Sequence, residues 1–410
     1  MLVGFTIENF RSIKKEVSLS MVSTKDTALD KNLIKKALKK DSLLRSAVLY
    51  GANASGKTNI IAALNFLKKL VLNSHTHQKG QQIKFSPFKL ERTWKSKPTK
   101  FHITFIKDNI RYEYGISFNN EKIIDEFLYH YPHNKKATIF ERKETNQYTF
   151  PTKEKDQKFI AKRTLENVLY LSKSVQENLE LTTPAFKWFD EILHFVGPYE
   201  QGISEEFTIN ILNKDEKLKK LVLNAISEAD IGIEDIDATI KEIKDIPDGF
   251  PEELKTFLSS RKEGLKQNEI KTKHKGVTFD FYSEESEGTK RMFSLIGHWV
   301  DALRRGKVLV IDELDTKLHH LLNIFLIKLF HEPSQNKKNA QLIFTTHNTN
   351  LLDQDIFRRD QIWFTEKEDK SGATDLYSLT EYSPRKDKDI QKGYLAGKYG
   401  ALPFIKNNGI

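Results

Sequence analysis

The clearest chemical feature of the chain is a glycine-rich run that matches the pattern G-x-x-x-x-G-K-[ST] in full. The run consists of Gly51, Ala52, Asn53, Ala54, Ser55, Gly56, Lys57 and Thr58. Glycines let backbone N–H groups close around phosphate oxygens without a clash from a Cβ atom. In this pattern Lys57 reaches the β- and γ-phosphates, and the Thr58 hydroxyl ligates Mg²⁺. The run therefore predicts a nucleotide site.

A second candidate is the apolar run Val308–Ile311, which is followed directly by Asp312 and Glu313. Four consecutive aliphatic residues predict a central strand that is buried on both faces, with Asp312 at the carboxyl end, where ligands bind in open α/β sheets. We expect Asp312 to hold Mg²⁺, directly or through water. We expect Glu313 to orient and deprotonate an attacking water. An apolar strand that ends in two acids is common, so this interpretation depends on the glycine-rich run upstream.

The next apolar run, Gln341–Thr346, is predicted to be another buried strand, and it ends at His347. A histidine in this place is expected to contact the γ-phosphate and to sense its presence. Glu313, His347 and Lys57 are therefore the candidate catalytic residues.

A third motif, Ser286-Glu287-Gly288-Thr289-Lys290, stands at the start of a predicted helix, 26 residues before Asp312. A helix N-terminus with a small hydroxyl and a glycine suits a phosphate. Taken alone, the same residues would form an ordinary N-cap.

The spacing of apolar residues predicts the elements that position these motifs. The run 47–50 directly precedes the glycine-rich loop, and Ile60, Leu64 and Val71 follow it at helical spacing. Strand, loop and helix in this order are what a phosphate-binding βα unit requires. Residues 101–131 alternate between apolar and polar types around two turn signals, which predicts an antiparallel meander.

The middle of the chain differs from both ends. Helical patterns dominate from about 164 to 265, with a loop signal at 245–249. Charged residues crowd 259–276, which we expect to form a flexible excursion, and a strand is expected near 277–282. The predicted fold class is α/β with three parts: a lobe with the phosphate loop and the meander at 1–163, a mainly helical insertion at 164–276, and a C-terminal lobe at 277–410.

Together these motifs resemble the ABC-type "AAA" ATPases related to RecF and SMC heads, and more narrowly the RloA-like group associated with bacterial anti-phage defence. The resemblance rests on the glycine-rich run, SEGTKR, VLVIDELDTKLHH and LIFTTHNTNLL, and it extends to FTIENFRSIKKEVSLSM and to the C-terminal segment. Residues 132–270 match only loosely. The resemblance implies an ABC-type P-loop ATPase head, with a mixed sheet and an antiparallel β lobe, that uses ATP and Mg²⁺ and hydrolyses ATP.

The resemblance also implies a composite site. In ABC-type ATPases the Ser-x-Gly signature contacts ATP that is held by the opposite subunit, so Ser286 and Gly288 imply a homodimer or higher homo-oligomer. In related ATPases the loop after the first strand approaches the nucleotide, which makes Arg11 and Ser12 candidates. Their alternative role is that of polar residues in a surface turn.

The chain departs from the ABC pattern in two places. Transporter-type ATPases carry Leu-Asp in the D-loop, and the defence group commonly carries Leu-His-Pro, whereas this chain has Leu318-His319-His320. His319 is thus a candidate contact across the dimer, and its alternative is a helix-start histidine. No Q-loop glutamine can be identified, and Glu126 is the one weak candidate.

Composition excludes several other functions. The chain has 410 residues, a formal net charge of +10 and no cysteine, which rules out disulfides, thiol nucleophiles and zinc hooks. No apolar run approaches the roughly 18 residues of a membrane helix, and the first ten residues are too polar for a signal peptide, so we expect a cytoplasmic protein that does not contact a membrane. Residues 74–100 carry seven basic side chains and one acid, with Phe85, Phe88 and Trp94 among them.

We therefore expect an ATP-binding and hydrolysing subunit of an anti-phage defence system that controls a separately encoded effector, a nuclease. The alternative is a RecF- or SMC-like DNA-binding ATPase in repair or recombination, in which 74–100 follows a phosphate backbone. A fused nuclease is disfavoured, because only 63 residues follow His347 and the R-x6-H spacing of Arg291 and His298 is taken as chance. A nucleotide kinase is disfavoured by Asp312, Glu313 and His347, which suit attack by water.

Overall fold

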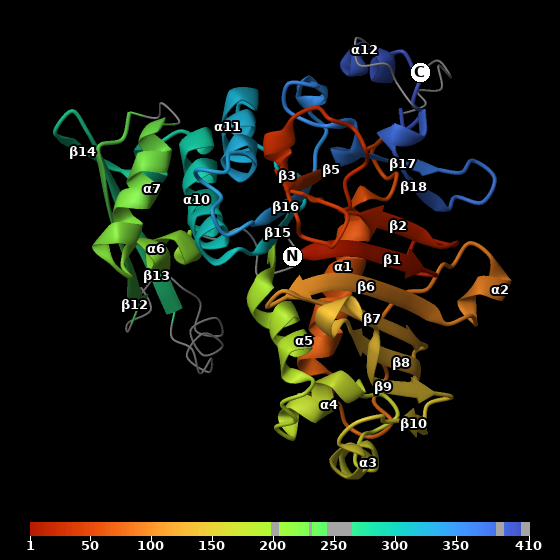
Figure 1. Ribbon diagram of the computed structural model, residues 1–410. Helices are drawn as coiled ribbons and strands as arrows, with labels where there is room; N and C mark the ends of the chain where they lie inside the picture. Colours follow the sequence, from red (N-terminus) through yellow and green to blue (C-terminus); the bar gives the residue numbers. More distant parts are fainter. Residues whose placement is uncertain (198–204, 229–231, 244–264, 383–388, 403–410) are drawn as a thin grey trace, which may run out of the picture.

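The structure is a computed structural model that describes residues 1–197, 205–228, 232–243, 265–382 and 389–402. Two large sheets lie on either side of helix α1 (Lys57–Asn73), and further helices cover the outer face of one of them (Figure 1). The α/β fold class, with a mixed sheet and an antiparallel β lobe, is confirmed.

The first sheet is antiparallel throughout, and its strands follow the order β10-β9-β8-β7-β6-β1-β2. Its strands are β1 (Leu2–Glu8), β2 (Val17–Ser20), β6 (Thr99–Lys107), β7 (Ile110–Phe118), β8 (Ile123–His130), β9 (Ala137–Lys143) and β10 (Gln147–Thr149). Successive side chains of a strand face opposite sides. Phe101, Ile103 and Phe105 of β6 are thus buried against α1, while His102 faces outward. The predicted meander is therefore confirmed as β6, β7 and β8.

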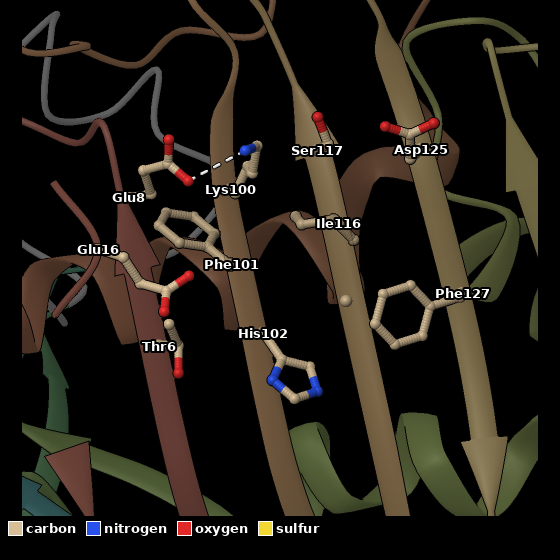
Figure 2. A pocket seen from close by; sticks show the side chains of 11 residues that line it. Thr6, Glu8, Glu16, Lys100, Phe101, His102, Ile116, Ser117, Asp125 and Phe127 are labelled. Carbon is tan, nitrogen blue, oxygen red and sulfur yellow. Dashed lines mark hydrogen bonds and ion pairs between the residues drawn. The ribbon is translucent and has the colours of Figure 1, made fainter. Parts of the chain in front are cut away.

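A hollow of about 240 Å³ marks the outer face of this sheet (Figure 2). Gly115 lies directly across from Phe127, and a Cβ atom at Gly115 would come within 2.3 Å of that ring. Phe127 therefore covers the glycine, an arrangement that protects the backbone of an edge or exposed sheet face. Glu8 and Lys100 form an ion pair of 3.0 Å beside the hollow.

The second sheet carries the chemistry, and its strand order is β11-β15-β16-β5-β17-β18. Its strands are β5 (Ser46–Tyr50), β11 (Leu193–Val196), β15 (Val308–Ile311), β16 (Gln341–Thr345), β17 (Ile362–Lys367) and β18 (Thr374–Ser378). All neighbours are parallel except β17 and β18. Strands β5, β15 and β16 are buried at every residue, as expected for parallel strands covered on both faces.

The two sheets are joined directly by the side chain of Gln341, which is fully buried. Its Oε1 accepts a hydrogen bond from the Leu2 backbone N–H at 2.6 Å. Its Nε2 donates to the carbonyl oxygens of Leu2 and Leu44 at 3.0 Å each. The start of β1 is therefore attached to the start of β16.

A helical layer covers the other face of the second sheet. It contains α6 (Glu206–Leu212), α7 (Glu216–Glu228), α10 (Glu287–Arg305) and α11 (His320–His331). Further described elements include α2 (Arg92–Lys95), α3 (Glu154–Ala161), α4 (Tyr170–Gln176), α5 (Thr183–Lys187), a π-helix (Trp188–Ile192), α9 (Phe281–Glu284), α12 (Ile390–Leu395), β3 (Leu33–Ile34) and β4 (Leu43–Leu44). None of the helices in the described ranges combines the length and the apolar character that crossing a bilayer requires.

The sequence interpretation of the middle region is wrong in part. A small antiparallel sheet is formed by β12 (Asp235–Ile243), β13 (Leu265–His274) and β14 (Val277–Asp280), so most of the stretch expected to be a flexible excursion is strand. Strand β11 also lies where helical patterns were expected. The loop signal at 245–249 lies outside the described residues. The division at 163/164 and 276/277 stays a prediction, although its second boundary falls between two strands of one sheet.

Candidate nucleotide-binding site

The glycine-rich run forms the turn between β5 and α1, as predicted. Helix α1 begins at Lys57, and Gly56 is its N-cap with φ of 116°. A Cβ atom at Gly56 would lie 2.2 Å from the Thr374 side chain on β18, and one at Gly51 would lie 2.4 Å from the Thr365 carbonyl oxygen. Both glycines are therefore required by the close approach of β17 and β18.

The rest of the loop is split between buried and exposed residues. Ser55 is buried, and its hydroxyl lies 2.6 Å from that of Thr365. Asn53 and Ala54 are exposed at the tip, and Ala54 has a φ of 63°. The backbone at the tip and the N-terminus of α1 thus offer N–H groups to an anion, which the helix dipole also favours.

Lys57 is almost fully buried behind this loop. Its Nζ donates to the carbonyl oxygens of Gly51 at 2.8 Å and Ala52 at 3.1 Å. Burial lowers the pKa of Lys57 from its usual range, and the carboxylates of Asp312 and Glu313 partly offset this shift. An ammonium held among carbonyl oxygens in this way is poised to neutralise phosphate charge.

Asp312, which follows β15, lies beside the start of α1. The Thr58 hydroxyl lies 3.3 Å from Asp312 Oδ1, and the Thr345 hydroxyl donates to the same oxygen at 2.6 Å. A hydroxyl and a carboxylate side by side are hard oxygen donors of the kind that Mg²⁺ prefers, so these residues fit that ion. Mg²⁺ is commonly held by one or two such groups together with phosphates and water.

Thr345 also fixes Glu313, which the sequence interpretation did not anticipate. The Glu313 backbone N–H donates to the Thr345 hydroxyl at 2.7 Å, and the Leu314 N–H donates to the Thr345 carbonyl at 3.1 Å. Glu313 itself is exposed and has a φ of 55°. One buried hydroxyl therefore connects the carboxylate of Asp312 with the backbone of the candidate base.

Arg291 is a second residue that the sequence interpretation missed. Its guanidinium, on α10, donates to the Glu313 carbonyl oxygen at 3.3 Å. Burial lowers the pKa of Arg291, and Asp315 and Glu313 oppose this shift. The residue that closely follows the signature motif therefore contacts the loop that carries the candidate base.

Arg11 and Ser12 lie beside the first turn of α1, and their contact with a nucleotide stays a prediction. Arg11 Nη1 donates to Asn59 Oδ1 at 3.3 Å, and Asn59 Nδ2 donates to the Ser12 hydroxyl at 2.6 Å. Thr374 completes the link, because its hydroxyl lies 2.7 Å from that of Ser12 and donates to the Ser55 carbonyl at 2.7 Å. The connection therefore runs from the loop after β1 to the first turn of α1.

His347 lies two residues beyond the end of β16 and is exposed. Its backbone N–H points to the Asp315 carboxylate at 3.3 Å. Asp315 belongs to the same loop as Glu313, so this contact places His347 next to the candidate base. A role in sensing the γ-phosphate stays a prediction.

Ser286 and Gly288 stand at the N-terminus of α10. Ser286 is the N-cap, and its hydroxyl accepts from the Thr289 backbone N–H at 3.1 Å. A Cβ atom at Gly288 would lie 3.6 Å from the Lys317 carbonyl oxygen. Ser286 is exposed, and a contact of its hydroxyl with a nucleotide on another chain stays a prediction.

His319 has the helix-start role that was its alternative. It is the N-cap of α11, and its Nδ1 accepts from the Leu321 backbone N–H at 3.4 Å. The ring is nevertheless exposed and lies 4.4 Å from the ring of His320. The contact across a dimer therefore stays a prediction.

Glu126 does not belong to the nucleotide site. It is fully buried in the antiparallel lobe, where it accepts hydrogen bonds from Tyr114 at 2.9 Å and from the backbone N–H of Tyr170 at 2.6 Å and Leu171 at 2.9 Å. Burial raises the pKa of Glu126, and the nearby Arg142 opposes this shift. The Glu126 carboxylate accepts hydrogen bonds from the start of α4, and Glu126 is therefore not a Q-loop residue.

Two other sequence features have structural roles. His298 hydrogen-bonds to His194 at 2.9 Å and stacks on Phe207, so its spacing from Arg291 carries no chemistry. In 74–100, Phe88 is buried and Phe85 packs on Phe118 with centroids 4.8 Å apart. These two rings are not available to stack on bases.

The fold and the site define this chain as a P-loop nucleotide-binding protein of the AAA class. It belongs to the family described as "AAA domain, putative AbiEii toxin, Type IV TA system", whose model matches residues 46–353. The match runs from β5 past His347, so it includes the glycine-rich run, the signature motif, Asp312, Glu313 and His347, and it leaves out Arg11 and Ser12. No curated protein matches the chain.

Solved structures with similarity to the chain include SMC head domains. The SMC head domain from Thermotoga maritima has 14% identity and a TM-score of 0.42, covering 92% of this chain and 98% of that one. An SMC head bound to the C-terminal winged-helix domain of ScpA has 13% identity and a TM-score of 0.40, covering 92% and 97%. An SMC head with an extended coiled coil, bound to the C-terminal domain of ScpA derived from Pyrococcus furiosus, has 14% identity and a TM-score of 0.38, covering 93% and 97%.

Proposed function

We propose that this protein is an ABC-type ATPase subunit of a bacterial anti-phage defence system, which dimerises around ATP in the cytoplasm and controls a separately encoded effector nuclease. The observation that carries the ATPase assignment is the connection from Thr58 through Asp312 and Thr345 to Glu313. The defence role and the effector rest on the resemblance to the RloA-like group and on the description of the family.

Each residue of the site has a separate role in ATP hydrolysis. The loop backbone and Lys57 bind the phosphates, and Thr58 and Asp312 would hold Mg²⁺, which neutralises phosphate charge when it is bound. The Glu313 carboxylate orients the attacking water and accepts its proton. Its exposure leaves room for a water and a nucleotide, and Thr345 and Arg291 fix its backbone from both sides.

The signature must act on a second chain in this proposal. Ser286 is exposed at the N-terminus of α10, and its contacts within the chain are those of an N-cap. In a facing copy the same hydroxyl and helix terminus would meet the γ-phosphate. Closure of the dimer then depends on ATP, and hydrolysis reopens it.

The alternative role in DNA repair has less support from the structure. The basic side chains of 74–100 could still contact phosphates, but the rings of Phe85 and Phe88 pack against other residues of the protein. Trp94 is covered by the Lys97 ammonium at 3.9 Å from the ring centroid. Base stacking is therefore not favoured there.

The test is the Glu313→Gln variant, which keeps the shape of the side chain and removes the base. We expect it to bind ATP normally, to lose about 100-fold or more in turnover, and to accumulate as an ATP-bound dimer. Sedimentation with ATP and steady-state turnover measure both properties. Turnover at the wild-type rate would overturn the assignment of the base.

A further inference from the structure

A groove on the helical layer is not used by the nucleotide site. It is lined by α7, α10, the last part of α11 at Leu329 and the segment after α11 up to Lys338, and its volume is about 530 Å³. Figure 1 shows α7 beside α10, on the side of the molecule away from the antiparallel lobe. The floor is apolar and is made by Leu221, Ala225, Ile296, Trp299, Val300, Leu303 and Leu329.

This floor is preformed. Trp299 is fully buried, and its Nε1 donates to the Leu326 carbonyl oxygen at 3.0 Å, which fixes the ring. Leu221 projects at the edge with 38% of its surface exposed. An apolar floor of fixed shape with a half-exposed leucine at its edge can receive an apolar side chain of another molecule.

The rim of the groove is basic. Lys217, Arg304, Lys337 and Lys338 line it, against the single acid Glu228. Within the part of the chain that the structure describes, these four cations form no ion pair. Neighbouring cations do, because Lys219 pairs with Asp235 at 3.0 Å, and Arg305 and Lys307 pair with Asp301 at 2.9 and 2.6 Å.

We propose that this groove binds an acidic amphipathic helix of a partner protein. The charge of the rim selects an acidic occupant, and the apolar floor selects one with a leucine-like stripe. The walls are helices and the segment after α11, with no strand of the described chain among them, so the occupant is a helix in a groove and not an added strand. The inference rests on the proposed function for the existence of a separate partner.

The position of the groove connects it to the ATP site. Helix α10 begins with Ser286 as its N-cap and carries Ile296, Trp299, Val300 and Leu303 further along. At 1.5 Å per residue, Ser286 and Val300 are about 20 Å apart along one rigid element. A partner seated in the groove would therefore respond to movements of the helix that offers the signature to ATP.

The test uses the full chain and a defined probe. The probe is a fluorescein-labelled peptide of about 18 residues with leucines on one helical face and glutamates on the other. Binding is followed by fluorescence anisotropy without nucleotide. Peptide binding and ATP hydrolysis are thus measured separately, so a failure of this proposal can be told apart from a failure of the proposed ATPase function. We expect Leu221→Glu, and separately Lys337→Glu with Lys338→Glu, to weaken binding at least about tenfold.

The matched control is the double variant Lys39→Glu with Lys40→Glu. It inverts the charge of another adjacent pair of exposed lysines, which do not line the groove. We expect it to leave binding unchanged. Equal weakening by both double variants, or equal binding of a peptide with the same composition in scrambled order, would show non-specific charge attraction and overturn the proposal. If Leu221→Glu changed the oligomeric state of the protein without peptide, the groove would be an interface with a second copy of the chain. That result would also overturn the proposal.

Discussion

Replacing Thr345 with valine isolates the connection between the Mg²⁺ side and the base side of the site. Valine has nearly the same shape as threonine, so the change removes the hydroxyl without leaving a large cavity. Two hydrogen bonds are lost: the bond to the Asp312 carboxylate at 2.6 Å and the bond from the Glu313 backbone N–H at 2.7 Å. The first involves a charged acceptor, and Thr345 is fully buried.

The loss of these two hydrogen bonds determines how much stability and turnover the Thr345→Val variant should lose. A hydrogen bond to a charged group contributes about 1.5–3 kcal/mol and a neutral one about 1 kcal/mol, so the free energy of unfolding should fall by about 2–4 kcal/mol. Glu313 also loses the contact that fixes its backbone, and misplacement of a catalytic group by about 1 Å can cost on the order of 100-fold in rate. ATP affinity should change far less, because the phosphate loop is untouched.

Urea unfolding, steady-state ATP turnover and titration with a fluorescent ATP analogue measure these three effects. Thr182→Val is the matched control, since Thr182 is also fully buried and its hydroxyl bonds to Ser174 at 2.7 Å and to the Leu179 carbonyl at 3.1 Å. That variant should lose stability and keep its turnover. Wild-type turnover in Thr345→Val, or an equal loss of turnover in Thr182→Val, would refute the reasoning.

Gly56→Ala should abolish ATP binding and destabilise the fold by more than about 1 kcal/mol, because its Cβ would meet Thr374 at 2.2 Å in a left-handed backbone conformation; normal nucleotide titration would contradict this. Arg291→Gln should reduce kcat with little change in KM, since the guanidinium contacts the Glu313 carbonyl and not the phosphate loop; a change confined to KM would count against it. Burial lowers the pKa of His331 to about 3, so the unfolded chain binds the additional proton, and stability should fall as the pH decreases below about 6.5. His331→Gln should reduce that slope in urea titrations by about 0.7 kcal/mol per pH unit at about pH 6.5, rising to about 1.4 near pH 5, and an unchanged slope would contradict the burial argument.

Local motifs were predictable from the sequence because short-range spacing determines them. The turn 51–58 needs only its own glycines and the helix that follows. The meeting of Asp312 with Thr58 was also within reach, because β15 and β5 are both neighbours of β16 and end at the same edge of the sheet. The hydroxyl of Thr345 lies at the same edge, so a polar residue at the end of that strand was the signal that could have found it.

Other features depend on tertiary contacts that the sequence does not display. Strand β13 reads as a charged loop, yet Ile270 and Thr272 are buried while Lys271 and Lys273 face solvent. Because the exposed face of β13 is charged, the alternation of buried and exposed residues that is typical of a strand was not recognised in the sequence. The aromatic residues of 74–100 likewise looked available for nucleic acid until the structure placed Phe88 in the core.

The central claim is that one ATP site needs two chains, and subunit mixing tests it most directly. The Lys57→Ala chain keeps its signature, and the Ser286→Arg chain keeps its phosphate loop. Each variant alone should be inactive, because every site in its homodimer is damaged. Random mixing of the two should restore about one quarter of wild-type turnover, since about half of the dimers are mixed and each mixed dimer has one intact site. No recovery on mixing, or full activity of Ser286→Arg alone, would contradict the composite site.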